Sequence, residues 1–448
     1  IAVNIKSVGT AGADTRADYN QGGGTYEDGT ANEGAISKVR FFFFNSDGSA
    51  YIMKGTDVNF LELNASVSSA GEAGQLQTIE GKTTAMLVID GNTKTAPAYM
   101  IAVVNPQTLS KLEKKAYRES QLRDEFTDQS FVKITTDGTG NKQYGDFVMS
   151  NSVYAENGAR VCASSVSGHV EGTSDAATKN PVDIYVERVV AKATTNVNTD
   201  KGWEQIASGA DNGKYKIKVG KINIDAEHEK DVYAVVQGWG LADENRTAEL
   251  EKQIDVTTNW TSTTLGIDPW TTPDYHRCFW SSSVPFTPSS GSNPIVNHAF
   301  SAFTTPFGTT PLYTCPNTFT TDEFKDSKNY EKPYDNTLTK VLVAAKLVYY
   351  DDDNNSHPAD ICKYRGIQIL GADNVLKQVA KDHSEYWTVD PNNASNHILL
   401  APTDLEYTRT DFGSNSNSNT DKLKSYEVRP VLKDGVKVYK KKSDGSFG

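Results

Sequence analysis

The first seventeen residues, IAVNIKSVGTAGADTRA (residues 1–17), decide how the rest of the chain is interpreted. Apolar residues alternate with small or polar ones over residues 1–6, which is the period of a strand with one buried face. The apolar positions are Ile1, Val3 and Ile5. Residues 9–15 are small and polar, Arg16-Ala17 follows, and exposed loops of this composition are preferred sites of proteolysis. The stretch therefore predicts a first strand, within residues 1–16, that seals the fold until the bond after Arg16 is cut.

The composition fits an all-β protein with many turns. The chain has 448 residues, including 34 Gly, 16 Pro, 21 Tyr and 17 Phe, and its length allows about two or three domains. A net charge of -12 disfavours nucleic acid and anionic membrane surfaces as partners. No export signal opens the sequence, and the longest apolar stretch, residues 341–350, is far shorter than the roughly 20 residues that span a bilayer. The composition favours an exported protein whose signal has been removed.

Strands dominate the rest of the pattern. Residues 41–44 are four consecutive Phe, which cannot alternate with solvent, so both faces of the strand at residues 36–44 must be covered. Between Gln107 and Phe126 apolar residues recur mostly at a spacing of three to four. This spacing predicts one helix of about twenty residues in the first domain.

A polar stretch at residues 199–212 separates two expected domains, residues 1–205 and 206–448. The second domain contains an unusual segment, residues 257–320, in which aromatic residues are spaced by Ser, Thr and Pro. Its aromatic residues include Trp260, Trp270, Phe279, Trp280, Phe286, Phe300, Phe303 and Phe307. They either pin an ordered loop to the domain or stack on sugars, and we favour packing because loops this long are uncommon in compact domains without such a role.

The four cysteines leave the disulfide state open. They are Cys162, Cys278, Cys315 and Cys362. None forms a CxxC pair and the seven histidines do not cluster with them, which makes a zinc site improbable. Two disulfides and free buried thiols are equally compatible with the sequence.

No motif in the sequence carries a catalytic mechanism. HExxH, GxSxG, GxxxxGK[ST] and a GxGxxG after a strand are all missing. His276 and Cys278 are close in sequence, but nothing orients them as base and nucleophile. The pattern favours a protein that is not an enzyme and needs no cofactor or metal.

Several stretches, in their order along the chain, resemble one family. They are Ile36–Phe41 with Asn45–Gly48, Ala98–Pro106, Phe147–Ser150, Val186–Lys192 and Tyr313–Thr318. The pattern resembles the type V pilins (fimbrillins) of Bacteroidales, and looks closest to the shaft subunit of the short (minor) fimbriae. The family's Y-C-x-E-N-T segment is altered at Tyr313–Thr318, where its Glu is missing.

The resemblance implies two β-sandwich domains of transthyretin-like Greek-key type. It also implies export as a lipoprotein, anchoring of the fimbria through the outer membrane, and maturation by an Arg-specific protease. The implied partners are identical subunits in a filament, accessory and anchor pilus proteins, and host proteins or glycans.

Loss of the first strand would open a groove that an extended peptide from another molecule can fill. One donor end and one groove form a contact that does not close, and such contacts build filaments. The donor is expected at the carboxyl end. Its candidate plugs are Val436 and Val438, with Val428 and Leu432 as second choice. Pro430 cannot donate a ladder hydrogen bond, which weakens the 426–432 strand as an insert, and residues 426–440 as an ordinary hairpin of the second domain remain an alternative.

Two functions follow from these patterns. The first is a fimbrial subunit that contributes to adhesion and colonisation. The alternative is a glycan-binding surface adhesin, or an accessory or tip subunit of the same pilus. Substitution of Trp270 and Trp280 would separate the two, because it should abolish glycan binding only in the second case.

Overall fold

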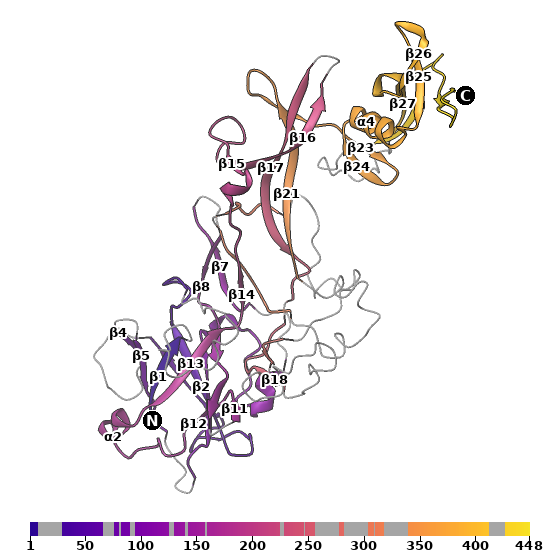
Figure 1. Cartoon of the computed structure of the whole chain (residues 1–448). Coiled ribbons are helices and arrows are strands. Elements are labelled where there is room, and N and C mark those ends of the chain that lie inside the picture. Colours follow the sequence, from indigo (N-terminus) through magenta and orange to yellow (C-terminus); the bar gives the residue numbers. More distant parts are fainter. Residues whose placement is uncertain are drawn as a thin grey trace. The chain divides into compact units, whose positions relative to one another are not determined.

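In the computed structural model the chain is mostly β-sheet with few helices (Figure 1). The structure describes residues 1–7, 29–65, 76–79, 82–89, 95–124, 130–138, 142–156, 159–224, 228–245, 247–255, 277–281, 303–308, 310–317, 339–411 and 426–448. The contacts divide the chain into two compact units. The first unit comprises residues 1–193, 241–297 and 311–340, and the second comprises 194–240, 298–310 and 341–448. The chain therefore passes between the units repeatedly, whereas the sequence predicts one passage from the first domain to the second, at residue 205.

One nine-stranded sheet forms the body of the first unit. Its strands are β1 (Ala2–Ser7), β2 (Lys38–Phe44), β3 (Phe60–Asn64), β4 (Leu76–Ile79), β5 (Lys82–Met86), β6 (Tyr99–Val104), β9 (Met149–Asn151), β12 (Ser164–Ser165) and β13 (Val182–Arg188). They follow the order β3-β2-β6-β9-β13-β1-β5-β4, with β12 beside β6. A bridge between Ala65 and Leu76 joins the two ends of this order. The sheet therefore curls round onto itself, and the described residues connect as one sheet.

The four consecutive Phe of β2 supply both faces of this sheet. Phe41 and Phe43 lie in an inner core together with the apolar residues of β1. Phe42 and Phe44 lie in a second core on the outer face. All four rings are fully buried. The prediction that both faces of this strand are covered is confirmed.

The helix predicted at residues 107–126 is wrong. The described residues there form two short 3-10 helices, η3 (Pro106–Thr108) and η4 (Glu119–Arg123), with irregular chain between them. The side chain of buried Asn59 binds both the backbone N–H and the carbonyl of Tyr117, at 3.0 and 2.9 Å, which holds this segment against the sheet. Three of the apolar residues with helical spacing still reach the outer core, Leu109, Leu112 and Leu122, and Tyr117 joins them there. Tertiary contacts thus override the local periodicity.

Shorter elements complete the first unit. They are β7 (Lys133–Thr136), β8 (Lys142–Gly145), β10 (Tyr154–Glu156), β11 (Ala159–Val161), α2 (Ser174–Lys179), β14 (Ala191–Ala193), β18 (Gln253–Asp255), β19 (Arg277–Phe279) and β20 (Leu312–Thr314). Strand β14 pairs with β20, and β18 pairs with β19.

The second unit contains three smaller sheets. The first follows the order β15 (Glu204–Gln205), β16 (Tyr215–Asn223), β17 (Glu229–Ala242), β21 (Lys340–Tyr350) and β22 (Ser356–Pro358). The second follows β24 (Ile367–Leu370), β23 (Ile361–Tyr364), β28 (Tyr426–Leu432) and β27 (Leu405–Asp411), and the third follows β26 (Asn393–Leu399), β25 (Tyr386–Asp390) and β29 (Tyr439–Lys440). The short 3-10 helices η5 (Thr199–Lys201) and η9 (Pro402–Asp404) lie in this unit.

Helix α4 (Ala372–Asp382) covers the core of the second of these sheets. It was not predicted, although its buried residues have helical spacing: Val375, Leu376, Val379 and Ala380. These residues pack in one cluster with Tyr426 and Val428 of β28. Across the described residues, no helix has the length and apolar character needed to cross a membrane.

A buried carboxylate lies in the outer layer of the first unit. The Glu251 side chain is 3% exposed, and its Oε1 accepts a hydrogen bond of 2.9 Å from Arg123. Its Oε2 has no hydrogen-bond partner among the described residues. Burial raises the pKa of Glu251 to about 7, against the opposing effect of Arg123.

This carboxylate predicts a pH dependence of stability. The folded protein keeps the Glu251 proton up to about pH 7, whereas the unfolded chain loses it near pH 4.5. The free energy of unfolding should therefore fall as the pH rises from 4.5 to 7, by roughly 1–3 kcal/mol. Urea unfolding at pH 5 and pH 8 measures this fall in the free energy of unfolding. The Glu251→Gln variant should not show the fall, whereas the exposed control Glu113→Gln should still show it. An equal fall in the Glu251→Gln variant would assign it to another group.

Candidate functional site

Strand β1 is an interior strand of the first unit's sheet. It pairs in parallel with β13, where Val3 lies opposite Val182. On its other side it pairs antiparallel with β5, where Val3 lies opposite Ala85 (Figure 1). A strand in this position has ladder hydrogen bonds along both edges. We call the space that it fills the β1 slot, bounded by residues 182–186 of β13 and 83–86 of β5.

The inner face of β1 is apolar and completely covered. Ile1, Val3 and Ile5 are 6%, 1% and 5% exposed and belong to the inner core. Burial of each side chain is worth roughly 1.5–3 kcal/mol. The alternation in the sequence predicted this strand and its buried face, and both are found.

The outer face of β1 selects for small and polar residues. Ala2 is 8% exposed and packs with Met86 and Ala177, the latter on α2, so little room remains beyond its methyl group. Asn4 donates a hydrogen bond of 2.7 Å to Asp183, and the Lys6 ammonium lies 2.5 Å from the same carboxylate. The hydrogen bond to Asp183 raises the pKa of Lys6. The inner side of the slot therefore has three apolar sites, now filled by Ile1, Val3 and Ile5, which we call sockets. Its outer side has one acidic group, Asp183.

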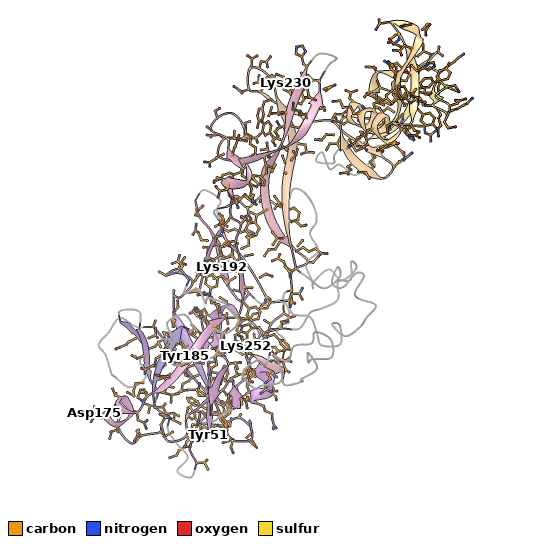
Figure 2. The ribbon with its side chains drawn as sticks, viewed as in Figure 1. Tyr51, Asp175, Tyr185, Lys192, Lys230 and Lys252 are labelled. Carbon is orange, nitrogen blue, oxygen red and sulfur yellow. The ribbon has the colours of Figure 1, made fainter. Side chains whose placement is uncertain are left out.

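A buried ion network holds residues 29–33 in place. Glu33 is 2% exposed, and its carboxylate accepts hydrogen bonds from the Tyr313 hydroxyl and from the Thr30 N–H, the latter at 2.6 Å. The Lys192 ammonium lies 3.1 Å from the same carboxylate (Figure 2 labels Lys192). Burial opposes the charge of Glu33, but these partners outweigh it and lower the pKa of Glu33. The left-handed Gly29 adjoins this network, since a Cβ there would lie 2.7 Å from Arg188.

This network attaches residues 29–33 to β14 and β20 independently of β1. The attachment was missed in the sequence because Glu33 and Tyr313 are 280 positions apart and neither belongs to a local pattern. The predicted cleavage bond, Arg16-Ala17, lies outside the described residues. After a cut at that bond, Glu33 would still hold residues 29–33 in the first unit.

The network predicts a large loss of stability in Glu33→Ala. Removal of the carboxylate takes one acceptor from the half-buried Lys192 ammonium and one from the Tyr313 hydroxyl. We expect the free energy of unfolding to fall by about 2–4 kcal/mol, measured by urea denaturation. The matched control is Asp57→Ala, whose ion pair with Lys115 is exposed and screened by solvent, so its loss should change stability little. Equal losses in the two variants would contradict a structural role for the network.

The candidate donor residues all lie in the second unit. Val428 is 2% exposed in interior strand β28, between β27 and β23, whereas Leu432 at the end of that strand is exposed. Val436 and Val438 lie in irregular chain after it, with Val438 packed against the edge of the core. The chain then forms the two-residue strand β29 on β25. Whether any of them enters a β1 slot stays a prediction.

Three cysteines are free and buried: Cys162, Cys315 and Cys362. None of these three forms a disulfide. Cys278 lies in β19, and its side chain is outside the description. Burial raises the pKa of the Cys315 thiol to about 12 and that of Cys362 to about 11, so both are protonated and unreactive at neutral pH.

Two described aromatic residues of the 257–320 segment, Trp280 and Phe303, are buried inside the units, whereas Phe279 and Phe307 are partly exposed. Trp280 is 4% exposed in the outer core of the first unit, with the Lys252 ammonium 5.0 Å from its ring centroid. Phe303 packs on Gly238 and Gly240 of β17, where a Cβ at Gly238 would lie 2.3 Å from the Phe303 carbonyl oxygen. Trp260, Trp270, Phe286 and Phe300 lie outside the described residues. Within the described part, no group of three or more His, Cys, Asp or Glu could hold a metal ion.

Two solved structures are similar to this chain over most of its length. A fimbrial assembly protein from Parabacteroides distasonis matches at 11% identity with a TM-score of 0.27, and the match covers 80% of this chain and 97% of that protein. A candidate cell adhesion protein from Bacteroides eggerthii matches at 14% identity with a TM-score of 0.30, covering 98% of this chain and 93% of that protein. No protein-family model and no curated protein matches the chain. Similarity at this level does not by itself assign a function.

Proposed function

We propose that this chain is a structural subunit of a cell-surface fimbria that polymerises by strand exchange after an Arg-specific protease removes β1. The observation that carries the proposal is the interior position of β1 in the sheet, with a predicted cleavage bond after it in the sequence. The resemblance of the sequence to type V pilins supports it. The same resemblance is the basis for export as a lipoprotein, attachment at the outer membrane, accessory and anchor partners, and a role in adhesion and colonisation.

Removal of β1 would create an acceptor that favours an incoming strand. The backbone groups of β13 and β5 that face β1 would lose their partners, and unpaired backbone groups that are shielded from water are costly. The three apolar sockets would open at the same time. An extended peptide from a second copy would restore both the ladder and the burial. Each added subunit presents a new slot, so the contact extends into a filament.

The shape of the slot favours one register of the carboxyl-terminal donor. Val436 in the socket of Val3 and Val438 in that of Ile5 place Gly435 at the narrow Ala2 position. This register puts Lys437 where Asn4 now meets Asp183. The socket of Ile1 would then receive Asp434, so two of three sockets gain an apolar side chain.

The 426–432 strand is the weaker donor. Tyr426 and Val428 are 1% and 2% exposed in the core of the second unit. Release of β28 would expose both side chains and break its pairing with β27 and β23. We therefore retain Val428 and Leu432 only as the second choice.

Cleavage with an Arg-specific protease tests the proposal. The expected result is a new amino terminus at Ala17, followed by filaments in electron micrographs. Arg16→Ala should remain uncut at this bond and monomeric, because β1 stays covalently attached. The control Arg365→Ala, at an exposed turn, should behave like the unmodified protein.

A second arm tests strand exchange separately from cleavage. A synthetic peptide of residues 1–7, added in excess to the cut protein, should occupy the slot and suppress filament growth. Stable monomers after complete cleavage and loss of residues 1–16 would contradict the proposal.

A further inference from the structure

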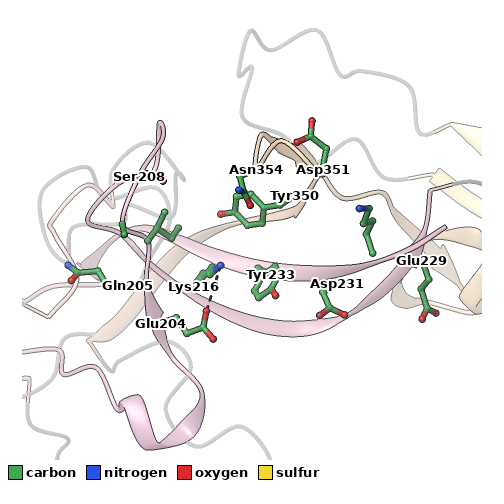
Figure 3. Close-up of a pocket in the computed structure, with 13 residues that line it drawn as sticks. Glu204, Gln205, Ser208, Lys216, Glu229, Asp231, Tyr233, Tyr350, Asp351 and Asn354 are labelled. Atoms are coloured by element: carbon green, nitrogen blue, oxygen red, sulfur yellow. Dashed lines mark ion pairs between the residues drawn. The ribbon is translucent and has the colours of Figure 1, made fainter.

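A hollow of about 630 Å³ lies on the five-stranded sheet of the second unit (Figure 3). Lys216 of β16, Tyr233 of β17 and Tyr350 of β21 line it, and Gln205 and Asn354 contribute amide groups. We call it the Lys216 pocket. Its volume is in the range of small-molecule sites. Nothing in the proposed fimbrial function uses it.

Lys216 carries a positive charge without a close acceptor. Its ammonium lies 4.5 Å from the ring centroid of Tyr233 and 5.0 Å from that of Tyr350. The nearest carboxylate, that of Glu204, is 3.7 Å away, which is beyond hydrogen-bond distance. The Lys216 side chain is only 22% exposed, whereas that of Glu204 is 65% exposed. The ammonium therefore retains unused donors beside a carboxylate that is free to swing away.

Tyr350 adds a second unused donor. Its hydroxyl oxygen is buried and has no hydrogen-bond partner among the described residues. Burial raises the pKa of Tyr350, so the hydroxyl keeps its proton at neutral pH. An acceptor placed in the pocket would satisfy the hydroxyl and the Lys216 ammonium together.

The other acids that line the pocket already have hydrogen-bonding partners. Asp231 pairs with Lys218 at 2.7 Å, Glu229 with Lys221 at 2.8 Å, and Asp351 with His357 at 2.8 Å. The second lining lysine, Lys230, pairs with Asp352. Lys216 and Glu204, 3.7 Å apart, are thus the lining charges without a hydrogen-bonded partner in the described residues. The lining acids also disfavour a doubly charged anion such as phosphate, because like charges repel. The carboxylate of Glu204 marks the kind of anion that this position accepts.

We propose that the Lys216 pocket binds a sugar that carries a carboxylate, of the uronic or sialic acid class. The carboxylate replaces Glu204 and accepts hydrogen bonds from Lys216 and Tyr350. The hydroxyl groups of the sugar meet the Asn354 amide and the Gln205 amide oxygen, since the Gln205 amide nitrogen already donates to the Gly213 carbonyl at 3.1 Å. Two tyrosine rings in the floor suit the apolar face of a sugar ring. The inference goes beyond the proposed function, because it concerns the second unit and does not require cleavage.

Titration of the uncut protein tests this proposal. Glucuronic acid and N-acetylneuraminic acid are the ligands, and glucose and acetate are the comparison compounds, with binding followed by calorimetry and ligand-observed NMR. We expect saturable binding of at least one acidic sugar, with a dissociation constant on the order of 1 mM. Binding should be at least about tenfold weaker for glucose and for acetate. Equal affinity for glucose would overturn the role of the carboxylate, and equal affinity for acetate would overturn the role of the sugar ring.

Three variants and one control locate the binding. Tyr350→Phe keeps the ring and should weaken binding about five- to tenfold, and Lys216→Gln should remove the preference for acidic sugars. Glu204→Gln should tighten binding about twofold because a competing carboxylate is lost. Lys218→Gln, on the same strand, should change affinity less than twofold. Unchanged binding in folded Lys216→Gln, or no saturable binding by the unmodified protein, would overturn the proposal.

Discussion

The pairing of β1 with β13 and β5 is the interaction on which the first unit depends. Without residues 2–7 the sheet would open between β5 and β13, and among the described residues β4 and β5 would stay joined to the other strands through the bridge between Ala65 and Leu76. The inner core would open along the same line, because Ile1, Val3 and Ile5 close it there. Residues 2–7 thus hold an interior position in the sheet.

Strand β1 and residues 29–33 are held by different kinds of interaction. Strand β1 is held by apolar burial and main-chain hydrogen bonds, which any extended peptide with suitable side chains can reproduce. Residues 29–33 are held by a specific network around Glu33, Lys192 and Tyr313. A substitute strand cannot supply that network. This difference would let one segment leave while its neighbour stays.

The sequence predicts the elements whose side chains alternate and misses those defined by distant contacts. The patterns of β1 and of the four Phe in β2 specify their buried faces directly. The spacing of Leu109, Leu112 and Leu122 suggested a helix, because irregular chain can place apolar residues at the same intervals. The Glu33 network unites residues from three separate segments, and the Lys216 pocket unites residues from four. No local pattern could bring them together.

The parallel pairing of β1 with β13 also constrains the order of folding. Residues 83–86 can meet β1 early in synthesis, but Val182–Val186 emerge about 180 residues after the strand that they must flank. Contacts of such separation form slowly because the intervening loop loses entropy. Until then the apolar side of β1 has no lasting cover in the growing chain.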